Sequence, residues 1–468
     1  MPTSFLSAEA CAASVAARYA LASPADARRC LAVGWLWLAV AALVGAGLFS
    51  VLLVLARAPY SKDLFAAADF FRVALVVHVD LSVLVWFAAF GGLLWTLNGG
   101  TRHLGLGWAG LAAAAAGALV MCAAPFLGTE PPVMSNYVPV LDGPVFLGGL
   151  ALFAAGCALL VARSMLAARR VGTRPDGAAA LRFGLNAAAV SAAVALIAFA
   201  WSYAALPAHL AGKAYFEVLF WGGGHVLQFT WTLLMFAAWL ALAEAGGARA
   251  PLSPRVALLL FGIALASVFA TPVIYLAYEI TSVEHYRLQT WLMRIGGGLA
   301  IVPFALAVLY ALATAPRARA GERPLRAALG GSLLLFGAGG LIGLAIDGSN
   351  VKIPAHYHGA IVGVTLAFMG LTYHLLPRLG CARPAPRLAT VQAWLYGAGQ
   401  LAHIAGLVWS GGYGVQRKVA GAEQVLRGAE QVAAMGLMGL GGLAAVAGGL
   451  LFVIIVLRSL WTSSGSRS

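Results

Sequence analysis

Charged residues are scarce in this chain. Only 10% of its 468 residues are Asp, Glu, Lys or Arg, whereas 62% are hydrophobic. A composition so poor in charge argues against a soluble globular protein and indicates a polytopic membrane protein. Acidic residues are the scarcer sign, with 16 against 30 basic residues. The net charge of +14 would suit a nucleic-acid-binding protein, but the positions of the basic residues argue against that function.

Cysteine is rare as well. The five cysteines form neither a CxxC nor a CxxCH pattern. Covalently attached haem c and cysteine-ligated metal sites are therefore not expected.

Apolar segments fill most of the chain. Twelve are long enough to cross a bilayer as helices: 31–56, 73–97, 105–127, 143–163, 182–205, 215–244, 256–280, 291–314, 326–346, 357–376, 388–410 and 434–457. We expect an all-α fold in which residues 31–460 form a single twelve-helix transmembrane catalytic domain. Residues 1–30 would be a cytoplasmic N-terminal segment, and residues 461–468 a cytoplasmic tail.

The basic residues predict the orientation of these spans. They gather before span 1 and after spans 4, 6, 8 and 10, at Arg18, Arg28, Arg29, Arg163, Arg169, Arg170, Arg174, Arg182, Arg249, Arg255, Arg317, Arg319, Arg323, Arg326, Arg378, Arg383 and Arg387. All of these positions fall on one side of a twelve-span chain. By the positive-inside rule that side is cytoplasmic, so we expect both termini in the cytoplasm. The expected membrane is of the bacterial inner-membrane type. The excess positive charge is thus a topology signal, and nucleic acid is not an expected partner.

Two histidines that stand two residues apart are the most informative feature of the sequence. The motif His356-Tyr357-His358 lies at the start of the tenth apolar segment. On an α-helix, positions i and i+2 point about 200° apart, so the two imidazoles leave opposite faces. Ionisable groups within membrane spans are costly and usually functional. We therefore interpret this segment as a helix between two haems; the alternative is a pair of ordinary interhelical hydrogen bonds.

Three further histidines share the depth of this motif. His78 in the second span, His225 in the sixth and His285 after the seventh all fall in the outer half of the membrane. Two axial imidazoles give a low-spin electron-transfer haem, whereas one leaves a position open for a gas. We expect the remaining histidines to be structural: His103, His209, His374 and His403.

These spans resemble subunit I of the haem–copper oxidase and nitric oxide reductase superfamily over about residues 30–460. The segments that carry the resemblance are His78-Val79-Asp80-Leu81, Trp221-Gly222-Gly223-Gly224-His225 and Ala355-His356-Tyr357-His358. The resemblance implies that His78 and His358 bind a low-spin haem and that His356 binds a high-spin haem. It also implies haems of the b type, and an iron or copper ion bound by His225.

The chain departs from the family's pattern at the end of the seventh span. Family oxidases carry two adjacent histidines there, whereas this chain reads Glu284-His285-Tyr286. The resemblance then implies His225, His285 and Glu284 as ligands of the non-haem metal, and hard oxygen ligands favour iron over copper. The expected catalytic residues are His356, His225, Glu284 and Glu279.

A second departure concerns tyrosine. The best-known oxidases place a tyrosine one turn after the histidine of the sixth span, where this chain has Phe229. Tyr275 and Tyr278 of the seventh span are candidates to replace this missing tyrosine, on the basis of their position alone. The sixth, eighth and ninth spans also carry almost no interior acid or lysine, so the sequence offers no evident proton route from the cytoplasm. Both features fit a nitric oxide reductase better than a proton-pumping oxygen reductase.

Polar residues of the outer loops provide further candidates. Arg417 and Lys418 resemble the basic pair that binds haem propionates in the family, where cations neutralise carboxylates. Glu130 and Asp142 are candidate oxygen ligands of a structural Ca²⁺ or Mg²⁺, and the alternative is a solvated loop.

The leading hypothesis is the catalytic subunit of a membrane nitric oxide reductase, which converts 2 NO, two electrons and two protons to N₂O and water. One alternative is an oxygen reductase of the cytochrome c oxidase type. Another is a non-catalytic haem-binding or transport scaffold, in which His225 and His285 are structural. We expect electrons from a membrane-anchored partner subunit with a cytochrome c or copper domain, because this sequence shows neither domain. Membrane lipid is the expected surrounding.

Replacement of His285 with alanine tests the part of the resemblance where the chain departs from the family's pattern. We expect the variant to lose the non-haem metal while the visible spectrum of the low-spin haem stays unchanged, because the two sites use different histidines. Metal analysis and reduced-minus-oxidised spectra of the purified protein measure both outcomes. Full retention of the metal would exclude His285 as a ligand.

Overall fold

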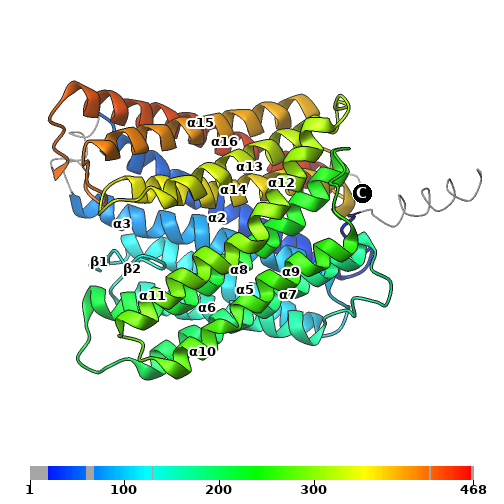
Figure 1. Ribbon diagram of the computed structural model, residues 1–468, viewed down its shortest axis with the longest axis horizontal. Coiled ribbons are helices and arrows are strands. Elements are labelled where there is room, and N and C mark those ends of the chain that lie inside the picture. The colour runs from blue at the N-terminus through cyan, green and yellow to red at the C-terminus, as the bar shows by residue number, and fades with distance from the viewer. Residues whose placement is uncertain (1–18, 60–67, 129, 421–422, 465–468) are drawn as a thin grey trace, which may run out of the picture.

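The computed structural model describes residues 19–59, 68–128, 130–420 and 423–464. They form a bundle of helices that run roughly along the longest axis of the molecule (Figure 1). Its α-helices are α2 (Arg28–Arg57), α3 (Ala68–Val79), α4 (Trp86–Asn98), α5 (Leu104–Ala123), α6 (Pro144–Leu166), α7 (Gly177–Ala205), α8 (Gly212–Ala245), α9 (Pro254–Val268), α10 (Ala270–Ala277), α11 (Val283–Leu292), α12 (Gly298–Thr314), α13 (Arg323–Leu344), α14 (Lys352–Leu375), α15 (Pro386–Gly412) and α16 (Ala429–Ser464).

Short elements join or end these helices. The π-helical turns η2 (Asp80–Val85) and η4 (Met293–Gly297) connect α3 to α4 and α11 to α12, so each pair forms one continuous span. The 3₁₀ turns η3 (Ala124–Phe126) and η5 (Leu376–Leu379) end α5 and α14. The strands β1 (Pro132–Val133) and β2 (Val140–Leu141) pair antiparallel in the loop between α5 and α6.

Eleven helices of the described residues are long and apolar enough to cross a membrane. They coincide with the first ten predicted spans and with the twelfth. Helix α15 occupies the predicted eleventh span, where Gln392, Gln400 and His403 lower its apolar character. The all-α polytopic membrane fold is confirmed, whereas the count of twelve spans and the location of both termini stay predictions. Residues 1–18 of the expected N-terminal segment and 465–468 of the expected tail lie outside the described residues.

The start of the eighth span differs from the prediction. The sequence placed it at residue 291 and put His285 in a loop, but the span begins with α11 at Val283. Ser282 is the N-cap, and its Oγ accepts a hydrogen bond from the His285 backbone nitrogen at 3.2 Å. Glu284, His285 and Arg287 make this first part of the span polar, which is why the hydropathy pattern missed it.

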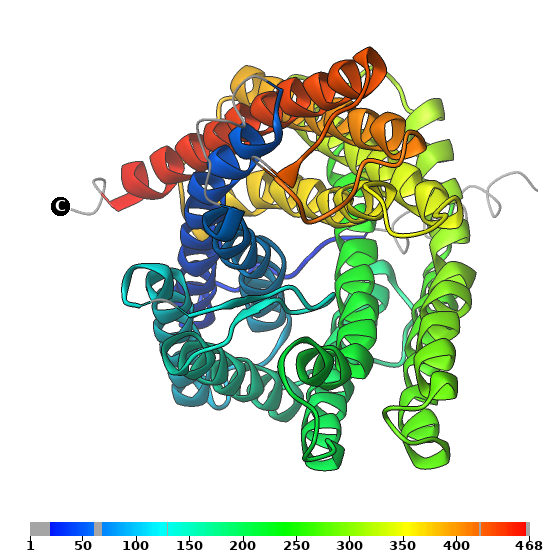
Figure 2. The ribbon, with the colours of Figure 1, turned by 90° about the vertical axis from the view of Figure 1, so that its left-hand side faces the viewer.

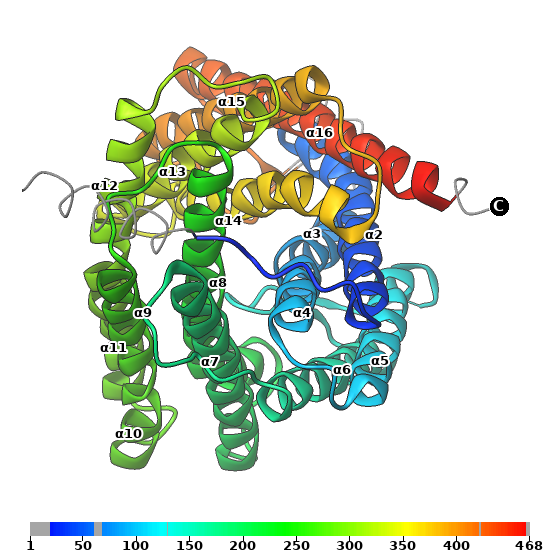
Figure 3. The same cartoon turned by 90° about the vertical axis from the view of Figure 1, so that its right-hand side faces the viewer.

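Helices α8 and α14 form the centre of the bundle. Views along the helices show them next to each other, with the other helices around them (Figures 2 and 3). In the most apolar stretch of 18 residues, 83% of the residues of each of these two helices are buried inside the protein. The corresponding share is 61% or less in the other spans. A buried chain of hydrogen bonds fixes their spacing: Trp239 Nε1 donates to Ser332 Oγ at 2.8 Å, and Ser332 Oγ donates to Gly363 O at 2.6 Å. Each such bond contributes about 1 kcal/mol.

Glycines allow the closest helix contacts, as is common in membrane bundles. Gly339 of α13 and Gly359 of α14 lie backbone against backbone, and a Cβ on either one would overlap the other helix. Gly406 of α15 meets the backbone of Met438 on α16 in the same way. These contacts set the distance between α14, which carries the His-Tyr-His motif, and its neighbour α13.

A pair of adjacent glycines tests this packing. We expect Gly339→Leu to destabilise the protein by about 1–3 kcal/mol or more, because the side chain must separate α13 from α14. Gly340→Leu is the matched control, since Gly340 is exposed and has no atom within 4 Å of a built Cβ. Thermal unfolding in detergent measures both. Equal melting temperatures for the two variants would contradict the close contact.

Candidate functional site

Histidines from four separate helices meet at one end of the bundle, which we call the histidine end. This end also carries the strand pair and residues 413–420 and 423–428, and it is the left-hand end in Figure 1. Figure 2 views the histidine end directly and shows the β1–β2 loop extending across it toward α8. His78 comes from α3, His225 from α8, His285 from α11, and His356 and His358 from α14.

The two imidazoles of α14 contact different helices. The His356 Nδ1 atom donates to Gly339 O on α13 at 2.7 Å. The His358 ring lies 4.6 Å from the His403 ring on α15, between centroids, and within electrostatic range of His78 on α3. The helical separation of about 200° therefore directs the two side chains toward different neighbours, and His358 forms one cluster with His403.

A shared hydrogen-bond pattern prepares several imidazoles to bind a metal ion. The Nδ1 atoms of His78, His225, His356 and His403 face the backbone oxygens of Ala46, Trp221, Gly339 and Met438 at 2.7–2.9 Å. A carbonyl oxygen only accepts, so Nδ1 carries the proton and Nε2 keeps its lone pair. Metal-bound histidines commonly have this arrangement, which fixes the tautomer and orients the ring.

The second cluster is built around His225. Its Nε2 lies 2.9 Å from the Tyr137 hydroxyl, which comes from the β1–β2 loop, and 3.5 Å from Thr290 Oγ1. His225 is 2% exposed. Burial raises the pKa of Tyr137 well above its usual value, so the neutral hydroxyl donates to Nε2. A hydroxyl therefore occupies the direction in which the imidazole offers its lone pair.

His285 lies beside this cluster. It is 1% exposed, is within electrostatic range of His225, and packs edge-on against Tyr275 with ring centroids 4.7 Å apart. Its Nδ1 finds no hydrogen-bond partner among the described residues. The Tyr275 hydroxyl lies 2.7 Å from Ser202 Oγ and donates to Ala198 O at 3.2 Å, so both of these hydrogen-bond partners are on α7.

The triple glycine before His225 makes room for these tyrosines. A Cβ on Gly222 would overlap the Tyr275 hydroxyl, and a Cβ on Gly224 would overlap the Tyr137 ring. Gly223 admits Phe199 in the same way. Any larger residue at Gly224 displaces Tyr137 from His225.

The predicted carboxylates lie elsewhere. Glu279 and Glu284 are both exposed, although Glu284 is adjacent in sequence to the buried His285. Successive helical residues point about 100° apart, so the two side chains of this pair diverge. Within the described parts of the chain, no group of three or more His, Cys, Asp or Glu is arranged to hold a metal ion.

The basic pair lies over the start of α14. Arg417 contacts Tyr357, the residue between the two histidines. Lys418 donates from Nζ to Met134 O at 2.7 Å, and burial beside Arg417 lowers the pKa of Lys418 to about 8. The loop is fixed to α14 by a backbone bond of 3.0 Å from Val351 N to Val415 O. Two cations are thus positioned at the histidine end, one beside Tyr357 and one beside the β1–β2 loop.

Most of the remaining candidate residues lie outside the two histidine clusters or have other partners. Both Glu130 oxygens accept from the N-terminus of α6, at Val145 N (2.8 Å) and Phe146 N (3.1 Å), so this carboxylate caps the helix. A Ca²⁺ or Mg²⁺ site at Glu130 and Asp142 stays a prediction. His103 and His209 are exposed, and His374 is partly buried near the opposite end of α14. His403 differs from the other three, because it is buried against His358.

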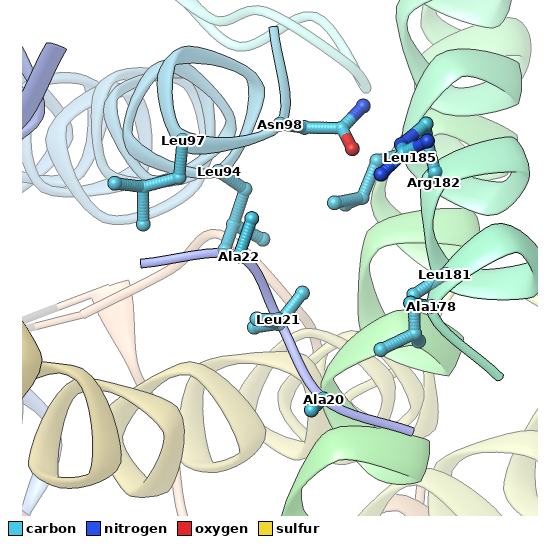
Figure 4. A pocket seen from close by; sticks show the side chains of 10 residues that line it. All are labelled: Ala20, Leu21, Ala22, Leu94, Leu97, Asn98, Ala178, Leu181, Arg182 and Leu185. Carbon is cyan, nitrogen blue, oxygen red and sulfur yellow. The ribbon is translucent and has the colours of Figure 1, made fainter. Parts of the chain in front are cut away.

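A pocket at the opposite end of the bundle is separate from the histidines. It has a volume of about 80 Å³ and lies between residues 20–22, α4 and α7, with Asn98 and Arg182 as its polar lining (Figure 4). This volume suits roughly two or three water molecules and not a haem.

Comparison with known proteins identifies the family. A family model described as cytochrome c and quinol oxidase polypeptide I matches residues 31–445. The chain belongs to this family. Two relatives are uncharacterised proteins: one from Rickettsia prowazekii (strain Madrid E) is 28% identical over 509 residues, covering 93% of this chain and 97% of that protein. The other, from Aquifex aeolicus (strain VF5), is 30% identical over 350 residues and covers 74% and 84%.

The fold agrees with this membership. A solved structure described as a heme-copper terminal oxidase dimer aligns with a TM-score of 0.71 at 16% identity, over 93% of this chain and 84% of that chain. Subunits I of this family are catalytic subunits of respiratory oxidases, and they generally bind two haems and a copper or iron centre. The protein is therefore a divergent, oxidoreductase-type subunit I and a multi-pass membrane protein.

Three polar residues of the site were missed by sequence reasoning. Tyr137 and Thr290 lie at His225 Nε2, and Glu217 accepts from the Asn136 backbone nitrogen at 3.2 Å beside Tyr137. Tyr137 and His225 are 88 positions apart, and no local pattern reports such a contact. The run Gly222-Gly223-Gly224 was the available signal, because three glycines within a membrane helix indicate bulky neighbours.

Proposed function

We propose that this protein is the catalytic subunit of a membrane nitric oxide reductase, which reduces 2 NO with two electrons and two protons to N₂O and water. In this assignment His78 and His358 hold the low-spin haem and His356 holds the high-spin haem. His225 and His285 hold a non-haem metal. The haems and the metal supply the redox chemistry, while the chain orients them and delivers protons.

The donor atoms fit these groups. His78 and His356 both donate Nδ1–H to a carbonyl and keep Nε2 for an axial bond. Arg417 and Lys418, held over the start of α14, are two cations that would neutralise haem propionates. His285 keeps a buried Nδ1 without a partner, which is an expensive state unless an ion or water occupies it.

The distribution of polar groups around His225 is the observation that carries the preference for NO. From Leu233 to Ala243, α8 is buried and contains apolar side chains apart from the Trp239 indole. No glutamate or lysine in the described chain is fully buried. At the histidine end, by contrast, Glu217 and Asn136 stand next to Tyr137. Protons then reach the site from the histidine end, and a proton-pumping oxygen reductase needs a route from the opposite side.

One argument from the sequence does not contribute. Glu279 and Glu284 are exposed, so the preference for NO no longer rests on a carboxylate ligand. The oxygen reductase remains the second candidate for a specific reason: Tyr137 places a partly buried phenol at His225, and a phenol is the group whose absence weighed against O₂ chemistry.

The assignment also includes a partner and an orientation. Electrons enter from a membrane-anchored subunit with a cytochrome c or copper domain, and the histidine end faces away from the cytoplasm. The arginine-rich loops after α6, α8, α12 and η5 lie at the opposite end of the helices, which supports this orientation.

A direct comparison of the two gases tests the function. We expect the reduced complex, purified with its partner subunit, to produce N₂O rapidly from NO under anaerobic conditions and to consume O₂ slowly. Gas chromatography and an oxygen electrode measure the two rates. Fast O₂ uptake without N₂O would make the protein an oxygen reductase.

A carboxamide at Glu217 tests the proton route. We expect Glu217→Gln to lower the rate of N₂O formation by about 100-fold, the lower end of the loss for a positioned proton donor or acceptor. Glu430→Gln, at an exposed position of the same end, is the control. In proteoliposomes with the histidine end outside, pH indicators should report proton uptake from the external medium alone. Uptake from the lumen would refute the route.

A further inference from the structure

We propose that the Tyr137 phenol oxygen is the third protein ligand of the non-haem metal, together with His225 Nε2 and His285 Nδ1. This inference rests on the proposed function, which assumes a metal at the two histidines. It departs from a ligand set made of histidines and carboxylates, because Glu284 is exposed and Tyr137 is not part of the sequence pattern that identified the site.

The first supporting observation is the direction of the His225 lone pair. Nδ1 donates to Trp221 O at 2.8 Å, so Nε2 is the one ring nitrogen free to bind a metal. The Tyr137 oxygen lies 2.9 Å from that nitrogen, and the two ring centroids are 4.7 Å apart with an interplanar angle of 48°. Two atoms bound to the same ion lie about 3–3.5 Å apart, since metal–nitrogen and metal–oxygen bonds are each about 2.0–2.2 Å. An ion on the Nε2 lone pair would therefore replace the hydroxyl hydrogen, and the phenol oxygen would move aside from its hydrogen-bonded position to bind the same ion.

The second observation is independent of the first. His285 is 1% exposed, and its Nδ1 has no partner among the described residues. Buried polar atoms are almost always satisfied, so this one calls for an ion or a water. A hydrogen bond of 3.3 Å from Trp221 Nε1 to Tyr286 O joins α8 and α11, the helices that carry the two histidines. Tyr275, whose ring packs against His285, also reaches the space beside Gly222, three residues before His225.

The position of Tyr137 is determined on all sides. Its ring fills the space left by Gly224 and packs edge-on against Trp221, with centroids 5.6 Å apart. The preceding residues are also anchored, because Asn136 donates to both Glu217 oxygens and Met134 O accepts from Lys418 Nζ. Such anchoring holds a ligand in place before the metal binds, which favours a specific site over an adventitious contact.

The chemistry of the donor set requires a further ligand. Two imidazoles alone leave a metal ion with too few protein ligands for a stable site. The described chain offers no third His, Cys, Asp or Glu in range. Tyrosine is an established ligand of iron, and a hard oxygen donor favours iron over copper. On binding, the phenol O–H bond breaks, the oxygen–metal bond forms, and the proton passes to solvent at the histidine end.

Two tyrosine-to-phenylalanine variants provide a matched test in the purified complex with its partner subunit. Tyr137→Phe keeps the ring and removes the oxygen. Tyr275→Phe is the matched control and also removes only a hydroxyl. Tyr275 fills the space beside Gly222, and its hydroxyl contacts Ser202 and not a histidine. The measurements are non-haem metal per protein, the visible absorption of the oxidised protein, and the low-spin haem spectrum as a check of folding.

We expect Tyr137→Phe to weaken the affinity for the non-haem metal by about 10–100-fold or more. Removing a residue that only hydrogen-bonds to a metal ligand already causes a loss of this size. The variant should also lose a phenolate-to-metal charge-transfer band that wild type and Tyr275→Phe both show. Tyr137→His, which supplies a nitrogen ligand, should recover the metal without the band. This variant keeps the test decisive where Tyr137→Phe is poorly folded.

The contrary results are distinct. Retention of the metal and the band in Tyr137→Phe would overturn the ligand role. A wild-type protein that binds the metal without the band would also overturn it, and Tyr137 would then act by hydrogen bonding to His225. A wild-type protein with two haems and no non-haem metal would refute the two-metal site itself, and thus the proposed function.

Discussion

An imidazole buried between membrane helices is costly unless its ring nitrogens have partners, and the arrangement of this protein depends on meeting that requirement. In four histidines one ring nitrogen has a partner of the same kind, because Nδ1–H donates to a backbone oxygen. In three of them the oxygen belongs to a neighbouring helix: Ala46 on α2, Gly339 on α13 and Met438 on α16. The close approach of these helices is therefore part of the site. The other nitrogen of each ring keeps its lone pair, which at His225 faces the Tyr137 hydroxyl.

Much of the fold could be predicted from the sequence. The hydropathy of long apolar segments located the spans, and the separation of about 200° between His356 and His358 anticipated that they contact different helices. These features depend on helical geometry and on the thickness of the membrane, which act locally along the chain. A prediction based on hydropathy also misses polar segments. The first turn of α11 is polar and capped by Ser282, so it carries no hydropathy signal and its start was not predicted.

The composition of the site was less predictable. Adjacency in sequence suggested Glu284 as a partner of His285, but the helix turns the carboxylate outward and the imidazole inward. Tyr137 reaches His225 from a loop 88 positions away, through a space that exists because Gly224 has no side chain. Contacts of this kind arise from the packing of α8 against the β1–β2 loop, and no periodicity within either segment encodes them.

The central claim is that α14 separates two haems, one held by two histidines and one by a single histidine. Haem analysis combined with magnetic circular dichroism of the purified protein, before and after addition of CO to the reduced form, tests it most directly. The account predicts two haems per chain, of which one is low-spin with two imidazole ligands and insensitive to CO, and the other is high-spin and binds CO. A single haem per chain, or two haems that both ignore CO, would contradict it.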